Sequence, residues 1–224
     1  MRELLVSPGP SPPRSHLAPG SVVSAVLPPQ SPSASEGLVA ALLDRIARHD
    51  PAALAHARRV AHGATLVAAA LGLDPHAIGE LRAAALLHDI GKLHVPMALL
   101  AKPAPLTFAE RRIVETHAAI GAKLLRGIPR LAALAPVVLH HHERYDGHRE
   151  GAPPGYPHGL SGEAIPLPAR IIAVVDAFDA MTSFRPYRAA RSPNEALVVV
   201  AAERGCQFDP LVVDAFEPVA ARWR

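Results

Sequence analysis

Apolar residues recur at helical spacing along most of this chain, and this period is the feature that most restricts its fold. The first such run comprises Leu38, Val39, Leu42, Leu43 and Ile46. From residue 35 onward no segment alternates apolar and polar residues as a half-buried strand does, and no internal repeat is present. We therefore expect an all-α protein, a single bundle of about seven or eight helices.

Start signals mark where several of these helices begin. Asp-Pro pairs at 74–75 and 209–210 place an N-cap residue before proline at the first helical position. Thr107–Glu110 and Ser192–Glu195 have the capping-box pattern. The expected helices cover residues from 35 onward, 52–71, 75–89, 107–126, 131–143 and 168–183, and two more begin at 193 and 210.

Glycine and proline divide these segments. Gly91 is expected to end the helix over 75–89. Pro136 must kink the segment 131–143 or begin a new helix there. The region from Tyr145 to Pro166 is rich in both residues and is expected to form a long loop.

The first 34 residues differ in composition from the rest. They contain eight prolines and only three charged side chains, Arg2, Glu3 and Arg14, and they show no helical period. Such a segment cannot bury a core, so we expect a disordered tail over residues 1–34 and one helical domain over 35–224. Whether the tail is a linker or has a function of its own stays open.

The composition of the 224 residues excludes several classes of protein. Half of the residues are hydrophobic, which is enough for a globular core, but only 4% are aromatic. The net charge of +3 is too small and too dispersed to indicate binding to DNA or RNA. No apolar run reaches the ~18 residues that cross a bilayer, so we expect no membrane association. The single Cys206 excludes an internal disulfide, which suits a cytoplasmic protein.

Histidine is unusually frequent, with 13 in the chain. His88 and Asp89 stand side by side at the end of an apolar run, where an imidazole and a carboxylate can ligate a metal ion together. The two oxygens of a carboxylate can also bridge two ions. Other histidines lie on the neighbouring predicted helices: His56, His117, His140, His141 and His142.

Asp176 adds a carboxylate to this set. It lies among the aliphatic residues of the predicted helix 168–183, and an unpaired carboxylate is costly to bury. A metal ion would supply the missing partner, and helix bundles build metal sites from such inward-facing residues. We interpret six further histidines as surface or capping residues with no part in the site: His16, His49, His62, His76, His148 and His158.

Taken in order along the chain, these motifs resemble those of the HD-GYP family, a branch of the HD-domain metal-dependent phosphohydrolases. The resemblance covers about residues 50–217. It rests on His56, His88–Lys92, His117, His141–Glu143, Gly155–Pro157, Asp176–Ser183, Arg185–Arg188 and Gln207–Pro210. The family is all-helical, binds two or three metal ions, often iron or manganese, and hydrolyses cyclic di-GMP to pGpG or GMP.

The resemblance implies a role for each matching residue. One metal ion would be held by His56, His88, Asp89 and Asp176. Asp89 would bridge to a second ion, held by His117, His141 and His142. Asp89 and Lys92 would be the catalytic residues, with Lys92 on the scissile phosphate. The substrate would contact Lys92, Tyr156, Asp179, Arg185 and Arg188.

These roles agree with the chemistry of the side chains. Two divalent ions can clamp a phosphodiester and lower the pKa of water. Imidazole-rich ligation favours iron, manganese, nickel or zinc over magnesium, and we expect two ions of iron or manganese. Lys92 can offset charge on the phosphate, although it could instead cap its helix. Arg185 and Arg188 suit phosphate and guanine, although they could instead be surface charges, and Glu143 is interpreted as a partner of a histidine.

Two departures from the family pattern affect these expectations. Family members with three metal ions have a glutamate four residues before the first histidine, where this chain has Ala52, so we expect two ions. About six extra residues, within 148–154, separate Asp146-Gly147 from Gly155. This insertion leaves the ligands intact but puts substrate access and the use of Tyr156 in question.

The sequence therefore predicts a metal-dependent phosphodiesterase acting on cyclic di-GMP. Two alternatives stay open. The first is a signalling module that binds a cyclic dinucleotide with little or no turnover, which the long inserted loop favours. The second is a phosphohydrolase of another nucleotide. Partners among signalling proteins and a homodimer also stay open.

Overall fold

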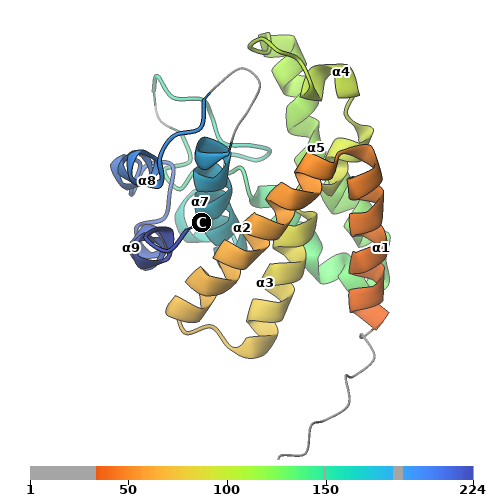
Figure 1. The fold of residues 1–224 in the computed structure, drawn as a ribbon, viewed down its shortest axis with the longest axis horizontal. Helices are drawn as coiled ribbons and strands as arrows, with labels where there is room; N and C mark the ends of the chain where they lie inside the picture. The colour runs from red at the N-terminus through yellow and green to blue at the C-terminus, as the bar shows by residue number, and fades with distance from the viewer. Residues whose placement is uncertain (1–33, 149, 184–188, 224) are drawn as a thin grey trace, which may run out of the picture. The chain divides into compact units, whose positions relative to one another are not determined.

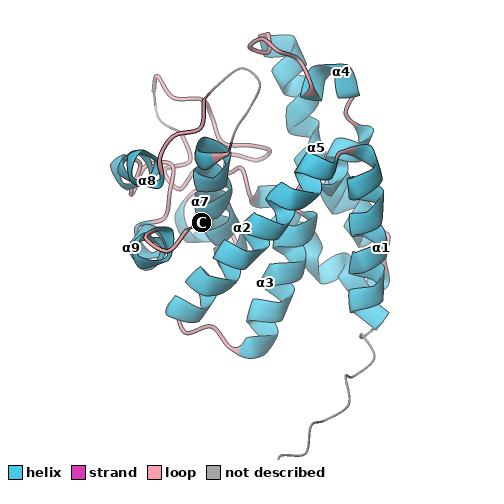
Figure 2. Ribbon diagram, in the orientation of Figure 1, coloured by secondary structure: helices cyan, strands magenta, loops and turns pink. Residues whose placement is uncertain are grey.

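The computed structural model describes residues 34–148, 150–183 and 189–223. Within these residues it contains nine α-helices, three short 3-10 helices and no strand, which confirms the all-α fold (Figures 1 and 2). The chain divides into the units Met1–Ser31 and Pro32–Arg224, and every described residue belongs to the second. The tail predicted over residues 1–34 lies outside the described residues, except for Ala34, which begins the first helix.

The helices follow the predicted order. The α-helices are α1 Ala34–His49, α2 Pro51–Ala70, α3 Pro75–Leu87, α4 Met97–Leu100, α5 Phe108–Arg126, α6 Ala135–His140, α7 Leu167–Thr182, α8 Pro193–Ala202 and α9 Pro210–Ala220. The 3-10 helices are η1 Ile90–His94, η2 Pro129–Leu134 and η3 Gly162–Ala164. Among the described helices, α4 with four residues and the 3-10 helices η1 and η3 have no counterpart in the prediction, because they are too short to show a helical period.

The predicted start signals form the expected contacts. The side chains of Asp74 and Asp209 accept hydrogen bonds from backbone N–H groups of the first turn. Both capping boxes, Thr107–Glu110 and Ser192–Glu195, form in full. Pro136 lies in the first turn of α6, directly after η2, so a new helix begins there and the continuous helix over 131–143 does not form.

The core is aliphatic, with α2 packed against α1, α3, α7 and α9 (Figure 1). The buried face of α2 consists of small side chains and a glycine, among them Ala57, Ala61 and Gly63, so neighbouring helices approach it closely. Phe178 of α7 and Phe216 of α9 are fully buried and pack edge to face, with their ring centroids 5.0 Å apart. Among the described residues, no helix combines the length and the apolarity that a membrane crossing needs.

Gly91 has a different role from the predicted one. α3 ends at Leu87, and Gly91 lies inside η1, where it does not adopt the positive φ of a helix-ending glycine. A Cβ atom at this position would overlap the carbonyl oxygen of His117 and would lie 2.7 Å from the backbone nitrogen of Gly121. The glycine is therefore required because η1, which follows Asp89, lies directly on the backbone of α5.

The contact between Gly91 and α5 predicts a stability difference between two glycine variants. Gly91→Ala should lower the free energy of unfolding by about 1–3 kcal/mol, because η1 and α5 must separate to admit the methyl group. Gly79→Ala in α3 is the matched control, because nothing lies within 4 Å of a Cβ atom there. It should be neutral or stabilising by up to about 1 kcal/mol. Urea unfolding followed by circular dichroism measures both, and equal midpoints for the two variants would contradict this packing.

Candidate metal centre

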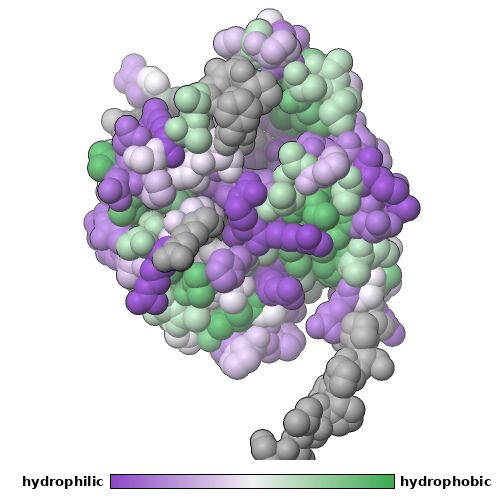
Figure 3. Space-filling view, viewed as in Figure 1, coloured by the Kyte–Doolittle hydropathy of each residue, from purple (hydrophilic) through white to green (hydrophobic). Residues whose placement is uncertain are grey.

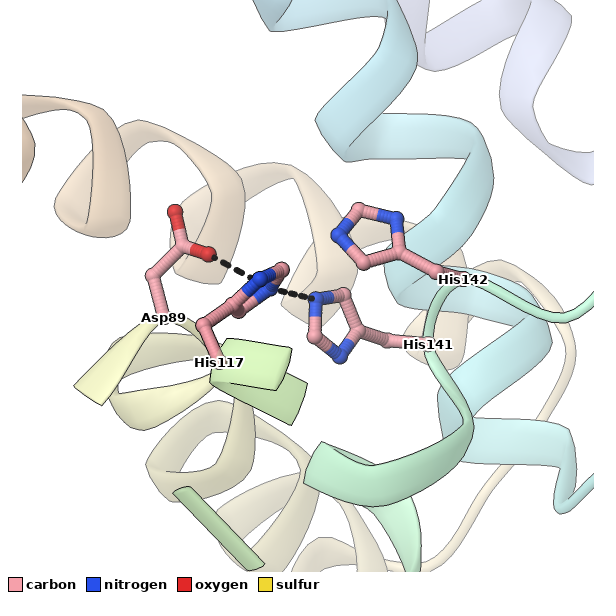
Figure 4. Close-up of side chains that lie close together, drawn as sticks. All are labelled: Asp89, His117, His141 and His142. Carbon is pink, nitrogen blue, oxygen red and sulfur yellow. Dashed lines mark hydrogen bonds and ion pairs between the residues drawn. The ribbon is translucent and has the colours of Figure 1, made fainter. Parts of the chain in front are cut away.

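The seven side chains that the sequence predicts as metal ligands lie together in the bundle. They come from α2, α5, α7 and the C-terminal ends of α3 and α6. They form two groups, and within each group the ligand atoms lie within 4.8 Å of one another. The first group is His56, His88 and Asp176. The second group, drawn in Figure 4, is Asp89, His117, His141 and His142.

Asp89 lies between the two groups. Its Oδ2 atom is 3.4 Å from Nε2 of His88 and 4.0 Å from Nε2 of His56, which belong to the first group. Its Oδ1 atom is 3.3 Å from Nε2 of His117, in the second group (Figure 4). Each carboxylate oxygen therefore faces a different group, which is the geometry that a bridging ligand requires.

Close contacts between ligand atoms characterise both groups. In the first group, Oδ1 of Asp176 is 3.0 Å from Nε2 of His56 and 4.0 Å from Nε2 of His88. In the second group, the Nε2 atoms of His117 and His141 are only 3.4 Å apart. Nitrogen and oxygen atoms of several ligands thus point toward common centres, as donors around an ion do.

Local helix geometry orients three of the histidines. Their Nδ1 atoms each lie 2.7 Å from the backbone carbonyl oxygen three residues earlier: His88 on Ala85, His117 on Val114 and His141 on Val138. A carbonyl oxygen can only accept, so the hydrogen is on Nδ1 and the lone pair of Nε2 is directed into the cluster. Fixing the tautomer in this way is how proteins prepare a histidine ligand.

The Nδ1 atom of His56 is hydrogen-bonded to a carboxylate, where the other three histidines contact a backbone carbonyl group. Its Nδ1 atom is 2.7 Å from Oδ2 of Asp179. Arg59 donates to both oxygens of the same carboxylate at 2.6 and 2.9 Å, and Ser183 donates to Oδ2 at 3.2 Å. The Asp179 side chain is fully buried and both its oxygens are engaged within the protein. These contacts orient His56, and they contrast with the substrate contact that the sequence predicts for Asp179.

The protonation of the histidines follows from their surroundings. Burial, reinforced by the neighbouring histidines, holds the pKa of His141 well below its ordinary value and lowers that of His142 to about 3. Burial also lowers the pKa of His117. In His56, burial acts in the same direction, but hydrogen bonds to Asp176 and Asp179 outweigh it and raise the pKa to about 10. Three of these histidines are therefore neutral at pH 7, as metal ligation requires.

The two carboxylates of the cluster are ionised at pH 7. Burial alone would raise the pKa of Asp89, but the Lys92 ammonium, 2.6 Å from its Oδ2 atom, holds it well below the ordinary range. Burial of Asp176 is likewise outweighed by its hydrogen bond to His56, and its pKa is lowered.

Buried atoms without partners show that this donor set fits divalent ions. Nε2 of His88 and Oδ1 of Asp89 are buried and have no hydrogen-bond partner among the described residues, although His117 lies close to Oδ1. A buried polar atom without a partner costs free energy, and both atoms point into the cluster. Neutral imidazoles and ionised carboxylates arranged around such atoms suit transition-metal ions such as iron, manganese or zinc.

Lys92 links the cluster to a cavity of about 470 Å³. Its Nζ atom is 2.6 Å from Oδ2 of Asp89, and its side chain lines the cavity together with Tyr156. Lys102 and Arg111 line the same cavity, beside Glu110 and Glu115 respectively. These two cationic residues could not be predicted from the sequence, because their spacing from the metal motifs carries no signal.

The predicted loop over 145–166 brings Tyr156 to the cluster. Its backbone N–H donates to the carbonyl group of His142 at 3.2 Å, and its ring centroid is 4.7 Å from that of His142. Glu143 holds the loop, because its buried carboxylate accepts hydrogen bonds from the N–H groups of residues 158–160. Tyr156 therefore lies beside the predicted ligand His142 despite the inserted residues.

Glu143 has a second partner outside the seven predicted ligands. Its Oε1 atom is 3.3 Å from Nδ1 of His140, and His158 completes a further group of close ligand atoms. The histidine partner that the sequence predicts for Glu143 is therefore His140. Arg185 and Arg188, predicted to bind the substrate, lie outside the described residues.

A family model of the HD domain matches residues 41–212 of the chain. The cyclic di-GMP phosphodiesterase response regulator RpfG of Xanthomonas campestris is 45% identical over 179 residues, which cover 77% of this chain and 46% of that protein. The 3'3'-cGAMP-specific phosphodiesterase 3 of Vibrio cholerae is 41% identical, over 71% of this chain and 34% of that protein. The chain thus spans less than half the length of these two curated relatives.

A solved structure has the same fold. The structure of Bd1817 from Bdellovibrio bacteriovorus, described as an HDG"Y"P protein, superposes with a TM-score of 0.62 over 75% of this chain and 52% of that chain. The two sequences are 19% identical there, so this likeness concerns the arrangement of helices alone.

The raised pKa of His56 predicts how metal uptake depends on pH. Without metal, His56 keeps its proton up to about pH 10, and an ion must displace this proton in order to bind. The apparent affinity for Mn²⁺ should therefore increase as the pH rises, by up to about tenfold per pH unit, between about pH 6 and 8. Competition with a metal-sensitive dye measures this slope.

The variant Asp179→Asn provides the matched test of the cause. It removes a negative charge that holds the proton on His56, so the dependence of affinity on pH should become shallower. His76→Ala, at an exposed histidine of α3, should leave the slope unchanged. An affinity of the unmodified protein that does not change with pH would refute the assignment.

Proposed function

Because this chain belongs to the HD-domain family, in its HD-GYP branch, we propose that it is a metal-dependent phosphodiesterase that hydrolyses cyclic di-GMP to pGpG or GMP. The observation that carries this proposal is the position of Asp89, with one carboxylate oxygen directed at each of two histidine groups. The 45% identical relative is named for this substrate, which favours cyclic di-GMP over other dinucleotides.

The proposed centre takes two divalent ions, of iron or manganese. His56, His88, Asp89 and Asp176 would hold the first, and Asp89, His117, His141 and His142 the second. When bound, two such ions withdraw charge from a phosphodiester and make a water molecule a nucleophile near neutral pH. Ala52 stands where a further carboxylate ligand would be expected, which supports two ions over three.

Lys92 and Tyr156 are the proposed contacts to the phosphate. Both line the cavity next to the cluster, and the Lys92 ammonium can offset negative charge that develops on the phosphate oxygens. Burial, together with the nearby charge of Asp89, raises the pKa of Tyr156, so its phenol stays protonated and can donate a hydrogen bond. Arg185 and Arg188 remain proposed substrate contacts on the strength of their motif.

A second candidate substrate has support of its own. The relative from Vibrio cholerae at 41% identity is named for 3'3'-cGAMP, which differs from cyclic di-GMP in one base. The phosphodiester chemistry is the same for both, so the distinction depends on contacts to the bases.

Turnover tests the proposal directly. The protein loaded anaerobically with Fe²⁺ or Mn²⁺ is incubated separately with cyclic di-GMP and 3'3'-cGAMP, and the products are separated by chromatography. We expect pGpG or GMP from cyclic di-GMP, at a higher kcat/KM than for 3'3'-cGAMP. Saturable binding of cyclic di-GMP without product would contradict the proposal and favour a signalling module.

Removing the bridging carboxylate should abolish both metal binding and activity. In Asp89→Ala, both ions lose a ligand, so elemental analysis should find most of the metal gone while the helical circular dichroism stays near that of the unmodified protein. His76→Ala is again the matched control, with unchanged metal content. Full activity of Asp89→Ala would refute the bridging role.

Removing the ammonium of Lys92 should separate catalysis from metal binding. Lys92→Met keeps the length of the side chain but loses its charge, and kcat should fall by about 10²–10³-fold while the metal content stays the same. Lys123→Met, at an exposed position of α5, is the control and should leave kcat unchanged. A rise in KM with kcat unchanged would contradict the catalytic role and assign Lys92 to substrate affinity only.

A further inference from the structure

A second cavity, of about 330 Å³, lies between α2 and the C-terminal end of α9. Its α2 wall includes Arg58, His62 and Leu66, which are spaced four residues apart and so share one face of the helix. Its other wall contains Arg222 and Trp223, which follow α9. Figure 3 shows strongly hydrophilic side chains gathered over α2, near the middle of the face of the molecule that it draws. None of these residues belongs to the seven proposed metal ligands.

The cavity is cationic, and two of its charges have no ion-pair partner among the described residues. Arg58, Arg59 and Arg222 all line it. Arg59 is engaged with Asp179, but neither Arg58 nor Arg222 forms an ion pair within the described part of the chain. Two guanidinium groups beside one hollow offer a planar set of donors that matches the oxygens of a phosphate.

Trp223 gives the cavity an aromatic wall whose position is fixed by packing. A Cβ atom at residue 63 would lie 2.8 Å from Cη2 of the indole, so the glycine in α2 makes room for this ring. The indole also packs edge to face on Phe178 at a centroid distance of 5.4 Å. Leu66 and Val219 extend the apolar lining. A flat apolar surface next to guanidinium groups suits an aromatic base joined to a phosphate.

We propose that this cavity binds a purine nucleoside monophosphate, with the phosphate between Arg58 and Arg222 and the base against Trp223. Its volume lies at the lower end of the range for small-molecule sites, which suits a mononucleotide better than a dinucleotide. The site does not depend on the proposed catalytic activity, because it shares no residue with the metal cluster.

Trp223 is also the reporter for the test, because it is the single tryptophan of the chain. GMP and AMP are titrated into the metal-free chain of 224 residues, and the indole fluorescence is corrected for absorption by the nucleotide. We expect a saturable change for both nucleotides. Guanosine and inorganic phosphate, which each lack half of the ligand, should require at least about tenfold higher concentration.

Two variants and two controls assign the signal to this cavity. Arg58→Ala and Arg222→Ala should each raise the midpoint about tenfold, whereas Arg130→Ala, at an exposed arginine in η2, should not change it. Asp89→Ala should keep the signal, because its change lies in the metal cluster.

Several outcomes would overturn the proposal. No saturable change, or midpoints unaffected by both arginine variants, would show that the cavity is not the site. Inorganic phosphate binding as tightly as GMP would reduce it to an anion site. Loss of the signal in Asp89→Ala would place the ligand at the metal centre. Because fluorescence requires no turnover, each outcome is independent of whether the chain hydrolyses cyclic di-GMP.

Discussion

The structure depends on the pairing of buried charged and polar side chains in an otherwise aliphatic bundle. Asp89 and Asp176 are ionised among histidines, and neither carboxylate would be tolerated there alone. Asp89 is paired locally with Lys92 and also lies close to His117 of α5, while Asp176 of α7 pairs with His56 of α2. The cluster therefore helps to fix the positions of α2, α3, α5, α6 and α7 relative to one another, together with apolar packing. The backbone at Gly91 packs closely on α5, because the missing side chain lets the segment after Asp89 lie directly on that helix.

A repeated local contact orients three histidines of this cluster. A histidine within a helix or at its C-cap can donate its Nδ1 hydrogen to the carbonyl group three residues earlier, and His88, His117 and His141 all do so. The orientation of each ring is therefore set by its own turn of helix. The sequence predicts the seven candidate ligands from the His88-Asp89 pair, from the histidines of the neighbouring helices and from an order of motifs that resembles a known family pattern. The hydrogen bonds that orient the rings are seen only in the structure.

Contacts between distant segments could not be predicted in the same way. Arg59 and Asp179 are 120 residues apart, and nothing in either segment indicates that they meet. The role of Gly91 depends on the backbone of α5, and the cavity beside Lys92 depends on Lys102 and Arg111, whose sequence neighbours are ordinary surface residues. Such features arise from the relative placement of helices, which helical periodicity alone does not determine.

Polar side chains at the interface between α2 and α7 connect the proposed metal cluster with the cavity beside Trp223. Asp176, Asp179 and Ser183 follow one another at spacings of three and four residues from α7 to its C-cap, opposite His56 and Arg59 on α2. One end of this polar stripe is a proposed metal ligand, and the other is an arginine that lines the cavity beside Trp223. Because Asp179 contacts both His56 and Arg59, any displacement of the Arg59 guanidinium must change the hydrogen bonding of the carboxylate that orients His56.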